Sequence, residues 1–406
     1  MSTTMNKKRS LWIIIGLTAL NGIGMTIVFP LFPFLIGKYV PAERIAIILG
    51  ALVSAYALCQ FIAAPAFGAL SDRYGRKLIL IISLLGSVVG YVFLGIGGAL
   101  WVLFLGRIID GLTAGNISAL FAYIADRTEP HERGKWYGYL GGAMGIGAMI
   151  GPAVGGLLGS TSITLPFFFT AGIMFISVIL TALFVPESLS PEKRTTNFPI
   201  KNLNPFGHFK EIFSLKEARA LLIMGAFFYV GLNIWQFNAS IFLKDVFMWG
   251  PSFIGGIFVL IGACDILSRV VVLPLLLKKL NERRIGIIGL IGLAIGTALL
   301  FVSSHIHLVI LIIIAVACIV LGEGLFDPSY NARLSLSVDE SKQGQLQGAN
   351  QSLQALYHVL VPLGAAAIYI YSHGVVFGIA SVLLLVGLYM FINLKTKEHY
   401  LNIKMI

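Results

Sequence analysis

The feature of this sequence that most constrains its fold is the regular return of apolar runs long enough to cross a lipid bilayer. A membrane-spanning helix needs about 20 mostly apolar residues. The 406-residue chain contains twelve such windows, which we number spans 1 to 12: residues 11–36, 46–70, 78–98, 100–125, 137–159, 165–185, 219–243, 252–277, 285–304, 307–335, 346–371 and 374–394. These runs are longer than the strands of a membrane barrel and apolar on all faces. The fold class that we expect is therefore an all-α polytopic membrane protein.

Composition and charge agree with this class. Of all residues, 57% are hydrophobic and 12% are charged, against about 25% charged in a typical soluble domain. The net charge of +11 comes mostly from lysines and arginines in alternate connections, at 7–9, 73–77, 127–135, 193–219, 278–284 and 395–404. Basic residues concentrate in cytoplasmic loops. We therefore expect both termini in the cytoplasm, and a lipid bilayer rather than a nucleic acid as the partner of this charge.

The longest polar connection, residues 186–218, predicts a cytoplasmic linker between two six-helix halves, residues 1–185 and 219–406. An internal repeat supports the division, because Pro152 in the first half matches Pro362 in the second. The three cysteines all fall within spans, where a thiol behaves as a small apolar group. We expect no metal site and no disulfide.

The connection between spans 2 and 3, Gly68–Lys77, reads Gly-Ala-Leu-Ser-Asp-Arg-Tyr-Gly-Arg-Lys. Gly68 and Gly75 permit a sharp reversal, so the charged side chains must lie at the bilayer surface: Asp72, Arg73, Arg76 and Lys77. The preference for basic residues in cytoplasmic loops does not explain Asp72. The whole pattern resembles the signature loop between helices 2 and 3 of the major facilitator superfamily. That resemblance implies that Asp72 helps latch the two halves, with Gln345–Gly348 at the start of span 11 as its expected partner.

Span 5 carries a second motif, a run of small residues around a proline: Gly147, Gly151, Pro152, Gly155 and Gly156. Glycines four apart share one helix face, where a missing side chain permits close helix contact. Generic small-residue packing would explain any single glycine. The motif as a whole resembles the antiporter motif of the exporting branches of the superfamily, which implies outward transport.

Further segments resemble the tetracycline-efflux group of the drug:proton antiporters: Pro30-Leu-Phe-Pro33, Leu103-x-x-Gly106-Arg107, Ala122-Tyr-Ile-Ala-Asp126, Pro186-Glu187-Ser188 and Gln343-Gly-Gln-Leu-Gln-Gly348. The resemblance implies a proton-coupled exporter in a bacterial cytoplasmic membrane. Tetracycline exporters carry acids in spans 1 and 3, where this chain has Asn21 and Gly90. Acids within a membrane are costly and usually functional. Whether tetracycline is a substrate, and whether the group's coupling scheme applies, therefore stays open.

Ionisable residues within the spans form three close pairs: Arg107 and Asp110, Asp265 and Arg269, and Glu323 and Asp327. The first two pairs are each self-neutralising, and Arg107 matches a span-4 arginine that the family links to proton transfer. Glu323 and Asp327 have like sign, so both cannot comfortably be ionised within the membrane and one should hold a proton. Our hypothesis makes Glu323 the proton carrier and Asp327 its tuning partner. The alternative is that both acids only support helix packing or a break at Pro328.

Amides and aromatic residues at membrane depth are the expected substrate contacts, because a buried amide without a partner is costly. They are Asn21, Tyr56, Gln60, Asn116, Tyr229, Asn233, Trp235, Gln236, Asn238, Asn331, Gln351, Gln354, Tyr357 and, as a further candidate, His358. Such a lining suits a small amphiphilic, partly aromatic compound. For any one of them the alternative is ordinary helix packing.

We expect a monomeric antiporter that exports such a compound, a drug for example, by alternating access, and not an enzyme. It needs no cofactor, since the chain has no Gly-x-x-x-x-Gly-Lys nucleotide loop and the proton gradient supplies the energy. The alternatives are an exporter of a native metabolite or siderophore, an uptake symporter, and a membrane sensor that does not transport.

Overall fold

The structure, a computed structural model, describes residues 2–195, 218–339 and 342–394. Within these residues every regular element is a helix, and twelve helices are long and apolar enough to cross a membrane. The predicted twelve-span, all-α fold is confirmed. Most of the predicted linker, and the basic residues beyond 394, lie outside the described residues.

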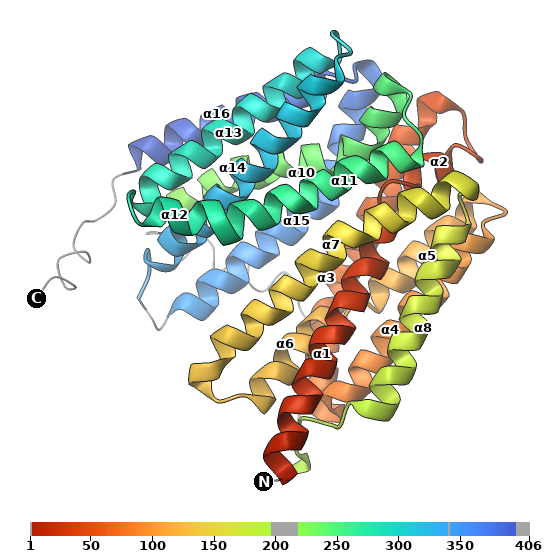
Figure 1. Cartoon of the computed structure of the whole chain (residues 1–406), viewed down its shortest axis with the longest axis vertical. Coiled ribbons are helices and arrows are strands. Elements are labelled where there is room, and N and C mark those ends of the chain that lie inside the picture. The colour runs from red at the N-terminus through yellow and green to blue at the C-terminus, as the bar shows by residue number, and fades with distance from the viewer. Residues whose placement is uncertain (1, 196–217, 340–341, 395–406) are drawn as a thin grey trace, which may run out of the picture.

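The first group of helices covers residues 2–184 and lies at the lower right of Figure 1. Its members are α1 (Ser2–Ile27), α2 (Phe32–Ile36), α3 (Ala42–Tyr74), α4 (Arg76–Ile96), α5 (Leu100–Leu112), α6 (Asn116–Arg127), α7 (Pro130–Thr161) and α8 (Leu165–Phe184), followed by the short 3₁₀ turn η1 (Pro191–Lys193). Span 4 is thus two helices, α5 and α6, because the chain leaves the helix between Leu112 and Asn116.

The second group covers residues 219–393 and lies at the upper left of Figure 1. Its members are α10 (Arg219–Phe247), α11 (Pro251–Ile266), the π-helix η3 (Leu267–Val272), α12 (Leu273–Leu277), α13 (Glu282–Ser303), α14 (Val309–Ser335), α15 (Gln343–Tyr371) and α16 (Val375–Asn393). Span 8 is therefore one long rod, α11–η3–α12, with a widened π turn in its second half.

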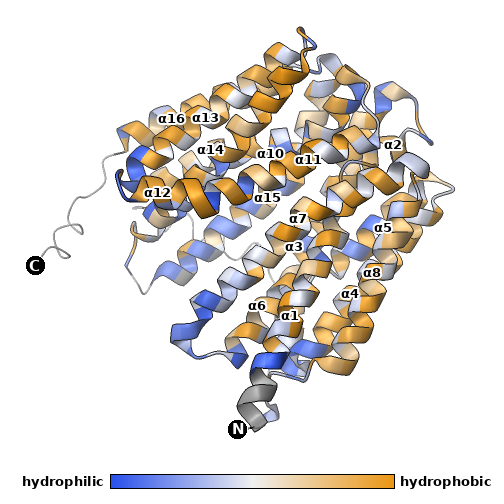
Figure 2. Cartoon of the chain, viewed as in Figure 1, coloured by the Kyte–Doolittle hydropathy of each residue, from blue (hydrophilic) through white to orange (hydrophobic). Residues whose placement is uncertain are grey.

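The connections between the long helices gather at two opposite ends of the bundle. The Gly75 end holds the α3–α4 connection at Gly75 and the connections 128–129 and 278–281. The Gly97 end holds the opposite connections at 37–41, 97–99, 162–164, 248–250, 304–308 and 372–374. Figure 2 shows hydrophilic residues gathered where α7 and α15 approach the Gly75 end, while the middle of the bundle is hydrophobic outside as well as inside. An apolar outer surface of this kind suits contact with lipid.

The two groups meet through α7 against α11, α3 against α15, and α2 against α10. The Ser54 hydroxyl on α3 donates a hydrogen bond to the Val359 carbonyl on α15 at 2.6 Å, and the Ser252 hydroxyl on α11 donates to the Gly156 carbonyl on α7 at 3.2 Å. All four residues lie in the halves of their helices nearer the Gly97 end. These contacts therefore join the groups at that end of the molecule.

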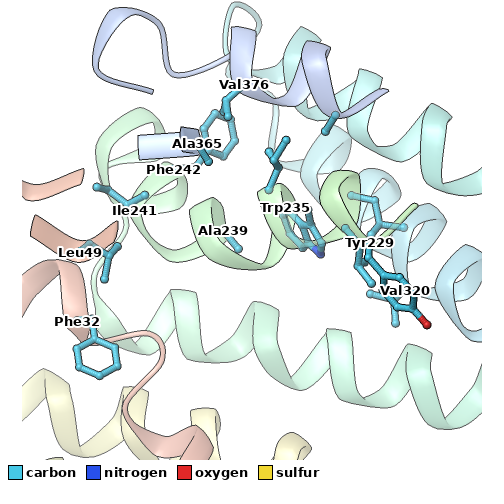
Figure 3. Close-up of a cluster of buried hydrophobic side chains, with 14 of the residues drawn as sticks. Phe32, Leu49, Tyr229, Trp235, Ala239, Ile241, Phe242, Val320, Ala365 and Val376 are labelled. Atoms are coloured by element: carbon cyan, nitrogen blue, oxygen red, sulfur yellow. The ribbon is translucent and has the colours of Figure 1, made fainter. Parts of the chain in front are cut away.

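A large cluster of buried apolar side chains continues across this junction (Figure 3). Leu49 from the first group lies beside Ile241 on α10, and Phe32 and Phe242 belong to the same cluster. Packing of this kind holds membrane helices together through close van der Waals contact. The Gly97 end is accordingly the tightly packed end of the junction.

Candidate functional site

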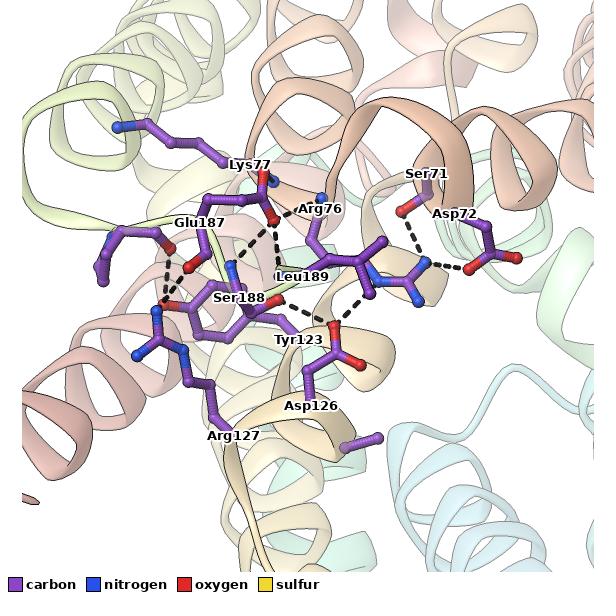
Figure 4. Close-up of polar contacts among 12 residues, drawn as sticks. Ser71, Asp72, Arg76, Lys77, Tyr123, Asp126, Arg127, Glu187, Ser188 and Leu189 are labelled. Carbon is purple, nitrogen blue, oxygen red and sulfur yellow. Dashed lines mark hydrogen bonds and ion pairs between the residues drawn. The ribbon is translucent and has the colours of Figure 1, made fainter. Parts of the chain in front are cut away.

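The predicted signature loop folds into a polar network at the Gly75 end, centred on Arg76 (Figure 4). Its guanidinium lies 2.6 Å from an Asp72 oxygen and 3.1 Å from an Asp126 oxygen, and it donates a hydrogen bond to the Ser71 hydroxyl. The Ser188 hydroxyl donates to the same Asp126 oxygen at 2.9 Å. One arginine thus links the ends of α3 and α6 to the segment after α8.

Glu187 completes this network by covering the start of α4. Its carboxylate accepts hydrogen bonds from the backbone N–H groups of Arg76 at 2.9 Å and Lys77 at 3.2 Å. These are N–H groups that a helix leaves unpaired at its N-terminus, where negative charge is also favoured. Gly75 has φ +107°, and a Cβ there would collide with the Glu187 carboxylate. Sequence reasoning did not assign this role, although Pro186-Glu187-Ser188 was one of the matched segments.

The expected latch between Asp72 and Gln345–Gly348 is not formed in this structure. Asp72 pairs instead with Arg76 inside the first group, and its side chain is 51% exposed. The reason is that the contacts between the two groups lie at the Gly97 end. The latch stays a prediction for a conformation in which the two groups close at the Gly75 end. Arg73 is also exposed.

The second polar centre is the buried pair Arg107 and Asp110 on α5. Their side chains lie 3.2 Å apart, and the Ser87 hydroxyl of α4 donates to the other Asp110 oxygen at 2.8 Å. The Arg107 guanidinium lies 3.8 Å from the centre of the Tyr56 ring, a cation–π contact. With the arginine 6% exposed and the aspartate 4% exposed, the pair is a neutralised, fully packed unit.

Asn21 and Gly90, which replace the acids of the tetracycline exporters, occupy very different surroundings. A Cβ at Gly90 would lie 2.7 Å from the Gly106 carbonyl and 2.8 Å from the Asp110 Cβ, so α4 and α5 touch there and leave no space for an acid. Asn21 is buried on α1, and its side-chain oxygen has no hydrogen-bond partner among the described residues. Asn116, another candidate, is buried at the start of α6, where its side-chain oxygen accepts from the Ile117 N–H.

The third polar centre joins α11, η3 and α14 in the second group. The Arg269 guanidinium contacts Asp265 at 2.7 Å and Asp327 at 3.7 Å. Asp327 also accepts hydrogen bonds from the Tyr229 hydroxyl at 3.1 Å and the Asn331 amide at 3.0 Å. This corrects the expectation that Glu323 and Asp327 form an isolated pair of like charges. A neighbouring helix brings an arginine to Asp327, which spacing within one helix could not reveal.

Glu323 is the remaining carboxyl of this centre, and it interacts electrostatically with Arg269, Asp265 and Asp327. Three carboxyls therefore share one guanidinium, two of them in direct contact with it. If all four groups were ionised, the centre would carry two uncompensated negative charges at membrane depth, which is costly. The arrangement can therefore bind a proton or another cation.

The π-helix η3 positions Arg269 for these contacts. The Ser268 hydroxyl donates to the Leu321 carbonyl at 3.0 Å, and Gly324 leaves the space that Ser268 occupies. Single π turns within α-helices are frequent at functional sites. Sequence reasoning missed this turn, since a π turn has no periodic signature of its own.

The predicted substrate contacts divide by exposure. Gln236, Gln351 and His358 are exposed, and Tyr56, Gln60, Asn331, Gln354 and Tyr357 are half-buried. Asn233 and Asn238 are buried, and each donates to a carbonyl one turn earlier on α10. Trp235 is 2% exposed within the apolar cluster (Figure 3). These last three residues are packing residues in this conformation, because the rotation of α10 turns them toward its neighbours.

The glycine motif of span 5 serves two contacts rather than one. Gly147, Gly151 and Gly155 pack against the backbone of α1 around Gly22–Ile27, inside the first group. Gly156 packs against Pro251 and Gly255 on α11, in the second group. Only the last of these glycines therefore lies at the junction between groups.

Comparison with known proteins agrees with these features. The chain is 33% identical over 368 residues to the class C tetracycline resistance protein of Escherichia coli, covering 90% of this chain and 91% of that protein. It is 29% identical over 412 residues to multidrug resistance protein 2 of Bacillus subtilis, covering 98% of each. A solved D-xylose-proton symporter shares the fold with a TM-score of 0.74 at 18% identity, covering 93% of this chain and 97% of that one. The predicted resemblance to the tetracycline-efflux group is confirmed. The family model for the Major Facilitator Superfamily matches residues 14–362, and this multi-pass membrane protein belongs to that superfamily.

Proposed function

We propose that this protein is an efflux transporter that exports a small amphiphilic, drug-like compound in exchange for protons. Relatives that match about nine-tenths or more of the chain include tetracycline and multidrug resistance proteins. The single observation that carries the coupling is the group of three carboxyls around Arg269. The protein acts as a monomer, without a cofactor and without catalysing a covalent reaction. Exporters of a native metabolite or siderophore, uptake symporters and non-transporting sensors are the competing functions.

In this proposal the Gly75 end faces the cytoplasm. Arg73, Arg76 and Lys77 lie at this end, as the rule for cytoplasmic loops requires. The N-terminus before α1 then lies in the cytoplasm, and so does the C-terminus after α16. With the groups joined at the Gly97 end, the present conformation is the one that receives substrate from the cytoplasm. Export follows when the junction opens at the Gly97 end and the groups close at the Gly75 end.

Glu323 is the proton carrier in this scheme. Asp265 and Asp327 both contact Arg269, and Asp327 has two further hydrogen-bond donors. Each of these contacts is an ion pair or a hydrogen bond to the carboxylate concerned. Glu323 shares the same guanidinium only electrostatically, so it is the carboxyl that most readily takes a proton. A cationic or strongly polar substrate that enters the centre favours release of that proton, which couples the two movements.

The test is substrate-induced proton release, measured in proteoliposomes with a compound chosen from a susceptibility panel in an efflux-deficient host. Glu323→Gln should abolish proton release while the protein still folds and binds substrate. Asp327→Asn should shift the pH dependence of proton release, because it removes the charge of the carboxylate that acts on Glu323. Asp110→Asn is the matched control in the first group. If release survives in Glu323→Gln and is lost in Asp110→Asn, the Arg107–Asp110 pair is the coupling site and the present assignment is wrong.

A further inference from the structure

A groove of about 440 Å³ lies on the second group, between α15 and α16, with α10 as its floor. Its lining is almost wholly apolar and includes Ile223, Ala226 and Phe227 on α10, Leu353 on α15 and Leu383 on α16. A groove of this volume falls in the range of ligand sites, roughly 300–1,000 Å³. It also contains Tyr357, which the sequence had placed among the substrate contacts.

The residues that line this groove include none of the charged centre around Arg269. One of its walls, α16, provides none of the charged residues of that centre. The side chains beside the opening face outward: Ile223 is 48% exposed and Val382, next to Leu383, is 59% exposed. Tyr229, which contacts Asp327, extends from a different face of α10 and does not line the groove. The occupant must therefore come from the membrane.

Among the described residues that line the groove, one is charged: Arg219, the first residue of α10. It lies where α10 meets the Gly75 end, at the level of the membrane surface. A guanidinium binds phosphate oxygens through two parallel hydrogen bonds, and basic pockets between membrane helices bind anionic lipid headgroups. An apolar groove with an arginine at its end is complementary in shape and charge to a phospholipid with an acidic headgroup.

We propose that this groove is a specific site for an anionic phospholipid of the bilayer. One acyl chain lies along Ile223, Ala226 and Phe227, between Leu353 and Leu383, and the lipid phosphate binds Arg219. The apolar walls hold any lipid chain of suitable length, whereas Arg219 selects for negative charge. The site is separate from the proton-coupling centre, so the proposal does not depend on which compound is exported.

The experiment is native mass spectrometry of the full-length protein with dioleoylphosphatidylglycerol and dioleoylphosphatidylcholine supplied in equal amounts. Both lipids carry the phosphate that Arg219 binds, but the quaternary ammonium of choline cancels the lipid's net charge and repels the guanidinium. We therefore expect one retained phosphatidylglycerol, preferred about fivefold, the factor that one basic side chain contributes toward an anionic lipid. Arg219→Gln should remove the preference and leave weak retention of either lipid. Ala226→Trp should fill the groove and remove retention of both. Arg284→Gln, on α13 near the same end, is the matched control and should behave as the natural protein does.

Several outcomes would overturn the proposal. One is an unchanged preference in Arg219→Gln, and another is an equal loss in Arg284→Gln, which would indicate general surface charge. Retention that persists in a folded Ala226→Trp protein would place the lipid elsewhere. If the Ala226→Trp protein does not fold, Leu383→Trp, which fills the groove from the opposite wall, is used in its place. A protein dimer that Ala226→Trp dissociates would show that a second copy, not a lipid, covers the groove.

Discussion

Gly156→Ala is expected to weaken the junction that holds the two helix groups together at the Gly97 end. A Cβ at this position would lie 2.7 Å from the Pro251 carbonyl oxygen and 3.1 Å from the Gly255 Cα. The neighbours are backbone atoms of α11, which cannot turn aside as a flexible side chain could. Helix α7 and helix α11 must therefore separate if the methyl group is to fit.

The size of the effect follows from that distance. An ordinary contact of a Cβ begins near 3.4 Å, so the helices must separate by about 0.7 Å at this point. Forcing one extra methyl into a packed contact costs about 1–3 kcal/mol. The contact exists only while the groups are joined at the Gly97 end, so the whole cost falls on that conformation. A difference of this size shifts the balance between two conformations roughly 5- to 150-fold.

The assay is a distance measurement between spin labels at Lys38 in the first group and Leu308 in the second, both near the Gly97 end, in a chain without its native cysteines. The variant should increase the population with the longer distance. Gly256→Ala is the matched control, because Gly256 lies on α11, the helix that Gly156 contacts, and a Cβ there would meet nothing within 4 Å. Gly151→Ala provides the second control, since its contacts are with α1 inside the first group and should lower thermal stability without opening the junction.

The reasoning fails if folded Gly156→Ala protein gives the same distance distribution as Gly256→Ala. It also fails if Gly151→Ala lengthens the distance as much as Gly156→Ala does. Either result would mean that the close approach of α7 and α11 does not select the present conformation.

Three other predictions concern the polar network and the close contact of α4 with α5. Asp72→Asn removes the ion pair with Arg76 and should leave the protein in the membrane but largely abolish transport in inverted vesicles; transport at the natural rate would remove Asp72 from the mechanism. Gly75→Ala forces φ +107° on an L-residue and displaces the Glu187 carboxylate, so we expect the free energy of unfolding to fall by about 1–3 kcal/mol. The measurement is the midpoint of thermal unfolding, with Glu187→Gln as the comparison variant. Gly90→Asp, which restores an acid of the tetracycline exporters, should reduce the yield of folded protein and confer no tetracycline resistance, and resistance in a susceptibility test would contradict the packing argument.

The number and placement of the spans could be predicted from the sequence alone. An isolated hydrocarbon-spanning segment must satisfy its own backbone hydrogen bonds, so a run of apolar residues specifies a helix without reference to any neighbour. The same locality explains why the reversal at Gly75 and the salt bridge from Arg269 to Asp265, four residues away on the same rod, were also within reach of sequence reasoning.

What the sequence left open were contacts between residues distant in the chain. The pairing of Asp327 with Arg269 and the burial of Trp235 depend on how each helix is rotated about its axis. The glutamate cap over the start of α4 depends on where the segment after α8 runs. In an apolar helix that rotation has weak sequence signals, because lipid-facing and protein-facing positions are both hydrophobic. Only the packed tertiary structure decides which side chains meet. For the same reason it alone decided that Asp72 pairs within its own group while the molecule is joined at the Gly97 end.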